Sequence, residues 1–256
     1  MFNITTPLTK TFFTSKFLTL GDIKDISTYL LDIKIGDLYE GESKRKKENA
    51  SKINASKEFI FNKCKECLDD SSSFDDLNIY EKNYVVLSIY VSSVNDKIEI
   101  TETCEKCGTA VNSSIPLNSV IDLYNKKADD VKKKINEVLN VGDIAVKFKI
   151  PKNYNIVSPQ YSQWISSIEV SKGIGNDKVI SKIFETDEDI TDLLYNNRDY
   201  PYKITSQIIK KITEELITFS LLVEYEKKTT CTNTECHHRE TNTYSIPDIL
   251  VFFEIA

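Results

Sequence analysis

The stretch Cys-Glu-Lys-Cys-Gly at residues 104–108 decides how the most informative part of this chain folds. Apolar and polar residues alternate on both sides of it, and Pro116 ends the alternation that follows. Alternation with period two is typical of half-buried β-strands, and a glycine lets the backbone turn tightly between them. We therefore predict a β-hairpin whose turn carries Cys104 and Cys107.

A second block near the other end of the chain repeats this order. Cys231 and Cys236 have four residues between them, and the flanking patterns predict strands. The triplet Ser-Ile-Pro follows the second cysteine of each block at nearly the same offset, at residues 114–116 and 245–247. We therefore predict two related zinc-ribbon-like hairpins. The strands of the second hairpin are expected over residues 221–226 and 241–246.

The two cysteine pairs together match the ligand set of a structural zinc site. Zinc prefers four tetrahedral ligands, and a turn with two closely spaced cysteines supplies half of such a set. We predict one shared knuckle-type site formed by Cys104, Cys107, Cys231 and Cys236. Because 123 residues separate Cys107 from Cys231, the zinc would join distant parts of the chain. The alternative is that the turns are plain hairpins with reduced thiols.

Four further residues are alternative ligands. His237 and His238 directly follow Cys236, and each either replaces a cysteine or lies at the surface of the turn. We favour the surface, because four thiolates already complete a tetrahedral shell. Cys64 and Cys67 share the apolar stripe of a predicted helix, where cysteine behaves as a small hydrophobic residue. We expect this pair in the core, and it remains the reserve pair of ligands.

The composition limits the classes of function. The chain has 256 residues and a formal net charge of −6, which argues against a general nucleic-acid clamp. We expect no secretory signal and no membrane-spanning segment, since no apolar run approaches the ~20 residues of a membrane helix. The six cysteines therefore predict reduced thiols or metal ligands inside a cell. No phosphate loop, nucleophile elbow or metalloprotease helix occurs, so we expect neither an enzyme nor a small-molecule substrate.

The other patterns predict an α+β protein in which helices pack beside antiparallel β-hairpins. A strand is expected over residues 144–150, ending at Pro151. We place the boundary between an N-terminal half, residues 1–150, and a C-terminal half, residues 151–256, near residues 151–159. Helices are predicted from near Asp22, over 51–68, from caps at Asp75 and Asp76 to about Ser93, and over 128–140, 187–195 and 205–220.

Four short patterns follow one another along the chain. The first pattern is Thr-Pro-Leu at 6–8 followed by Phe-Leu-Thr-Leu at 17–20, and the second is Phe-Asp-Asp-Leu-Asn-Ile-Tyr at 74–80, which precedes the first cysteine pair. The third is Ile-Ala-Val-Lys-Phe-Lys-Ile-Pro at 144–151. The fourth is a predicted helical segment at 212–219, which precedes the second hairpin and Leu-Val-Phe-Phe at 250–253. In this order the chain resembles the baseplate hub assembly proteins of T-even-like contractile-tailed bacteriophages.

The resemblance implies a non-enzymatic protein of tail morphogenesis, either a hub component or an assembly factor. Its partners would be other phage tail and baseplate proteins, met in the host cytoplasm during assembly or in the virion's tail baseplate. Phe12, Phe13, Phe252 and Phe253 are expected either to dock on such partners or to fill the protein's own core. The alternative function is a zinc-ribbon module that contacts nucleic acid in transcription or replication.

Overall fold

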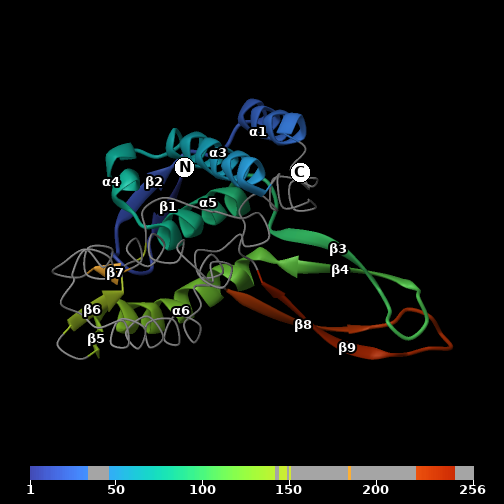
Figure 1. The fold of residues 1–256 in the computed structure, drawn as a ribbon. Coiled ribbons are helices and arrows are strands. Elements are labelled where there is room, and N and C mark those ends of the chain that lie inside the picture. The colour runs from blue at the N-terminus through green and yellow to red at the C-terminus, as the bar shows by residue number, and fades with distance from the viewer. Residues whose placement is uncertain (34–45, 142–143, 149, 151–183, 186–222, 246–256) are drawn as a thin grey trace.

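A computed structural model of the chain describes residues 1–33, 46–141, 144–148, 150, 184–185 and 223–245. These residues form a largely helical body, from which two β-hairpins extend side by side as an arm (Figure 1). The predicted α+β fold, with helices beside antiparallel hairpins, is confirmed. The arm consists of β3 (Lys97–Thr103), β4 (Ala110–Pro116), β8 (Glu224–Thr230) and β9 (Arg239–Ser245).

The body is built around the helix α5 (Ile79–Ser93), in which every residue from Ile79 to Leu87 is buried. Such a helix has no exposed polar stripe, and its apolar residues are buried together with the polar Glu81, Lys82 and Asn83. The prediction of a helix here is confirmed. Around α5 lie α1 (Leu20–Ile33), α3 (Lys46–Lys65), α4 (Ser71–Asp76), β1 (Phe2–Thr5) and β2 (Phe12–Ser15) (Figure 1).

The start of α5 corrects one detail of the prediction. Asp75 and Asp76 do not cap this helix but form the last residues of the short helix α4. Asp70 caps α4, and Asn78 caps α5 by accepting a hydrogen bond from the backbone N–H of Glu81 at 3.1 Å. Aspartate and asparagine are both favoured at N-caps, and this segment offers several of them within a few positions.

The segment before α1 is a β-hairpin. β1 and β2 pair antiparallel, with Phe2 opposite Ser15. Successive side chains of a strand point to opposite sides, so Phe13 is fully buried in the core while the neighbouring Phe12 is 57% exposed. Of the two roles expected for these phenylalanines, Phe13 therefore fills the core and Phe12 stands at the surface.

α6 (Leu117–Asn136) follows β4 as one continuous helix. The prediction of a helix over 128–140 was wrong at its end, because residues 138–141 form the strand β5 (Val138–Val141). Val138 and Leu139 fit a helical period and a short strand equally well, and pairing with β6 (Ile144–Phe148) favours the strand. The prediction of a strand from residue 144 is confirmed. The third strand of this sheet is β7 (Phe184–Glu185), which pairs with β6.

Several predictions concern residues outside the described ranges. These are the helices at 187–195 and 205–220, the boundary at 151–159, and the phenylalanines Phe252 and Phe253.

Candidate metal centre

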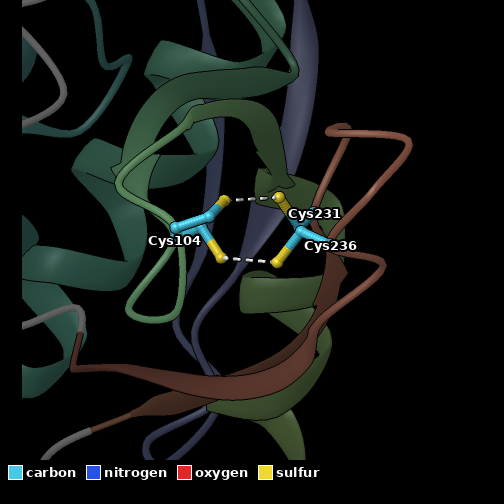
Figure 2. Close-up of side chains that lie close together, drawn as sticks. Cys104, Cys231 and Cys236 are labelled. Carbon is cyan, nitrogen blue, oxygen red and sulfur yellow. Dashed lines mark hydrogen bonds between the residues drawn. The ribbon is translucent and has the colours of Figure 1, made fainter.

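The arm ends where the two cysteine-bearing turns meet (Figure 1). Cys104 Sγ lies 3.9 Å from Cys236 Sγ, as Figure 2 shows, and Cys107 Sγ lies 3.5 Å from Cys231 Sγ. All four sulfur atoms lie within 4.8 Å of one another. The structure thus brings together the four cysteines predicted to share a metal. We call residues 104–111 and 231–239 the arm tip.

The spacing of the sulfur atoms fits a tetrahedral metal ion. Zinc binds thiolate sulfur at about 2.3 Å, so two ligands of a regular four-sulfur site are about 3.8 Å apart. The separations across the hairpins, 3.5 Å and 3.9 Å, lie on either side of this value. Four thiols leave no open position for a substrate, which is the arrangement of structural sites and not of catalytic ones. These four residues therefore fit a closed, structural metal site.

The first turn is shaped by its own backbone. Gly108 N donates to Cys104 O at 2.8 Å, and Cys104 N donates to Thr109 O at 2.9 Å. Gly108 has φ +72°, in the left-handed region that glycine enters without the penalty of a Cβ atom. The turn therefore curls so that the sulfurs of Cys104 and Cys107 both face the second hairpin.

The second turn reaches a similar geometry with different residues. His237 N donates to Asn233 O at 3.2 Å, as Gly108 N does to Cys104 O, and His237 has φ +46°. In this bond Asn233 takes the position of Cys104, whereas in the bond from Cys231 N to His238 O at 2.8 Å Cys231 does. Cys231 lies two residues earlier, which accounts for the wider spacing of the second pair.

Asn233 is the residue of this site that the sequence reasoning missed. Its side-chain Oδ1 accepts a hydrogen bond from Glu235 N at 2.9 Å, which holds the turn in the manner typical of asparagine. Its Nδ2 also lies 3.5 Å from Thr109 Oγ1 of the first turn. The signal was present in the sequence, since Asn233 precedes Cys236 by three positions, as Cys104 precedes Cys107.

The thiols of Cys107 and Cys231 ionise differently. Hydrogen bonds from the hydroxyl and the backbone N–H of Thr109 lower the pKa of the Cys107 thiol to about 6. The backbone N–H of Asn233 lowers the pKa of Cys231, but desolvation and the hydrogen bonds with Cys107 and Cys104 outweigh it and raise that pKa to about 12. Thiolates this close resist ionising together, and a bound dication removes that resistance.

The arm tip holds little apolar surface of its own. Its buried residues are Cys104, Val111 and Cys231, with Cys236 packed against them, and they form a cluster separate from the body core. A protein hydrogen bond contributes only about 1 kcal/mol to stability, so a shared metal would be the strongest link between the hairpins. Besides the contact of Asn233 with Thr109, side-chain hydrogen bonds between the hairpins run from Asn242 Nδ2 to Glu102 Oε1 at 2.7 Å and from Lys227 Nζ to Ser114 O.

The alternative ligands do not belong to the cluster of four sulfurs. Cys64 near the end of α3 and Cys67 in the turn just after it are buried in the body core, as predicted, although the helix ends at Lys65 and not at residue 68. His237 is exposed, and His238 Nε2 lies 4.0 Å from Glu240 Oε2. In the part of the chain that the structure describes, no histidine belongs to the cluster of candidate ligands.

A comparison with protein families adds an independent finding. Residues 38–254 match a family described as T4 bacteriophage base plate protein. This chain belongs to that family. The baseplate family match covers both cysteine turns, α5 and α6, and it confirms the family to which the order of segments pointed. The patterns at residues 6–8 and 17–20 precede the matched residues. No curated protein and no solved structure matches the chain.

The described helices were also compared with the needs of a membrane span. None of them is long and apolar enough to cross a bilayer.

Proposed function

We propose that this chain is a non-enzymatic structural or assembly protein of the hub of a contractile phage tail baseplate, and that it works by binding other tail proteins. The observation that carries the proposal is the baseplate-family match over residues 38–254. The closed set of four thiols at the arm tip supports a structural role, since it offers no open metal position for a reaction.

Within this proposal the metal is zinc, held by Cys104, Cys107, Cys231 and Cys236. Four thiolates in a tetrahedral arrangement select zinc or an iron–sulfur cluster. The sulfur separations of 3.5 Å and 3.9 Å match the edge expected around a single ion. Bound zinc supplies no chemistry here beyond crosslinking the two hairpins.

The arm is the part of the molecule that we expect to meet its neighbours. It extends away from the body, and the cysteine cluster lies at its far end (Figure 1). A binding element that is rigid before association loses less conformational entropy when its partner arrives. Zinc at the tip therefore prepares the arm for assembly by keeping both hairpins together.

The decisive experiment follows baseplate assembly in a phage whose copy of this gene is disrupted. We expect electron microscopy of the lysate to show incomplete tails, and the wild-type gene supplied in trans to restore complete baseplates. The variant Cys104→Ser should restore far fewer, and Cys67→Ala, outside the cluster, should restore as many as wild type. Normal baseplates without the gene would refute the proposal.

A binding measurement separates this function from the nucleic-acid alternative. The purified chain should bind tail proteins of the same phage and show no affinity for DNA. DNA binding that weakens steeply with salt, together with no retention of tail proteins, would favour the zinc-ribbon module instead.

A further inference from the structure

We infer that the arm tip has a second closed state, in which the same four sulfurs form two disulfides across the hairpins, Cys104–Cys236 and Cys107–Cys231. This inference rests on the proposed zinc site for its first state, and it adds a covalent modification that the zinc site alone does not require. It makes the connection between the two hairpins independent of the metal once the protein meets an oxidant.

The sulfur positions favour this pairing. Two sulfur contacts run between the hairpins, at 3.5 Å for Cys107 with Cys231 and 3.9 Å for Cys104 with Cys236. A disulfide has its sulfurs at about 2.05 Å, so each pair must approach by only about 1.5–2 Å. Both movements bring the two hairpins closer together at the arm tip, where they are already in contact.

Each pair also joins an accessible sulfur to a buried one. Cys107 is exposed and its partner Cys231 is buried, while Cys236 is half-buried and its partner Cys104 is buried. An oxidant therefore reaches one cysteine of each pair first, and the buried cysteine beside it is placed to complete the bond. This is the division of roles between an attacked and a resolving cysteine.

The reaction balances with a peroxide as the oxidant. The accessible thiolate attacks one peroxide oxygen, which leaves a sulfenic acid and a hydroxide that takes up a proton to become water. The buried thiolate then attacks the sulfenic sulfur, forms the S–S bond and expels a second hydroxide, which is likewise protonated. Each pair gives two electrons to one hydrogen peroxide. When both pairs have reacted, four thiolate ligands are gone and the zinc ion leaves.

The two states suit two compartments. A cytosol keeps thiols reduced and therefore favours the four-thiolate metal site, whereas the medium outside cells favours disulfides. A baseplate-family protein that leaves the cell in a virion passes from the first compartment to the second. With cross-hairpin disulfides, β3–β4 remains tied to β8–β9 after the zinc has gone.

The body cysteines provide a built-in contrast. Cys64 on α3 is fully buried, and Cys67 in the turn after α3 is 7% exposed; both lie among the core residues. Peroxide that reaches the arm tip should therefore leave these two thiols reduced while the protein stays folded.

The test uses the full chain, purified with zinc under reducing conditions and then treated with hydrogen peroxide. A chromogenic chelator should detect one zinc ion released per chain as four of the six thiols disappear. Peptide mapping without reduction should find Cys104 joined to Cys236 and Cys107 joined to Cys231. The variant Cys231→Ser should lose the second of these bonds and keep the first. Disulfides within each turn, disulfides between chains, or sulfinic acids as the main products would overturn the inference.

A second measurement keeps the inference separate from the zinc proposal. Limited proteolysis should cut the arm tip in reduced protein stripped by a chelator, and should spare it in both zinc-loaded and peroxide-treated protein. If purified protein never holds zinc but still forms the two cross-hairpin bonds, the metal proposal fails and the oxidised state stands. If zinc is bound and peroxide-treated protein is cut as readily as stripped protein, the oxidised state fails alone. The variant Cys64→Ala/Cys67→Ala is the matched control, because it should leave both results unchanged.

Discussion

The body and the arm tip of this protein are held together by different means. The body buries large apolar side chains completely, among them Phe13, Phe74 and Leu87. The tip buries one aliphatic side chain, Val111, together with Cys104 and Cys231. Between them lies the base of the arm, where Ile98 and Ile115 still belong to the body core. Apolar burial therefore ends part-way along the arm, and the sulfur cluster begins where it ends.

This difference decides how each region responds to damage. In the body, stability is spread over many contacts, so removing one side chain costs a part of it. At the tip, the connection depends on one candidate ion, and removing one of four ligands takes away most of the binding. We therefore expect graded effects in the body and all-or-none effects at the tip.

The largest effect is expected for Cys104→Ser. We expect zinc content to fall from one ion per chain to nearly none after dialysis against a chelator, because the remaining ligands no longer complete the tetrahedral set. Mass spectrometry of the metal content measures this directly. The circular dichroism of the helices should stay unchanged, since α5 and α3 lie in the body. A variant that keeps its zinc would remove Cys104 from the site.

A large loss of stability without a loss of zinc is expected for Leu87→Ala. Leu87 is 1% exposed in the core, and truncation of a buried leucine costs about 2–5 kcal/mol of unfolding free energy. Urea denaturation measures this loss. Folded protein should still hold one zinc ion per chain, because Leu87 is not part of the tip cluster. Loss of zinc in a variant that remains folded would contradict the separation of the two regions.

Intermediate effects of opposite sign on zinc affinity are expected from substitutions at Gly108 and His237, the two turn residues with positive φ. A Cβ atom on Gly108 would meet nothing within 4 Å, so Gly108→Ala strains only the backbone, by about 1 kcal/mol. His237→Gly relieves the same strain in the second turn. We expect Gly108→Ala to weaken zinc binding several-fold and His237→Gly to strengthen it, both measured by competition with a chelator. Equal signs for the two variants would show that the turns are not equivalent.

The smallest effect on the tip is expected for Cys64→Ala combined with Cys67→Ala. These cysteines pack as small hydrophobic residues, so each substitution costs about 1 kcal/mol of body stability, close to the cost of a buried methylene. Zinc content and zinc affinity should equal those of the wild type. A drop in zinc content would return this pair to the list of ligands.

Much of the arm could be predicted because its signals are local. The alternation of apolar and polar residues around Cys104 and Cys107 predicted both strands of the first hairpin. The close spacing of cysteines within each turn predicted which four side chains would form one ligand set. The contact between the two distant turns was predicted from the preference of zinc for four ligands, because no local pattern in the sequence indicates that these turns meet. The helix α5 was also predictable from its length and its apolar content.

The misses have physical causes that the local sequence does not resolve. Val138 and Leu139 fit two periods, and only pairing with β6 decides between them. Asp75 and Asp76 competed with Asn78 as caps, and the position of the short helix α4 settled the competition. Asn233 was missed because the site was predicted from its cysteine ligands alone. The second turn is held by a backbone hydrogen bond, in which the carbonyl of Asn233 accepts from His237 N.

The central claim is tested most directly by hydrogen exchange of the full protein, measured first with zinc bound and again after a chelator has removed the metal. We predict that amides at residues 104–111 and 231–239 lose their protection together, while those of α5 keep theirs. Unchanged exchange at both turns after the metal is gone, or loss of protection in α5 to the same extent, would contradict the claim that a metal closes the tip and apolar burial holds the body.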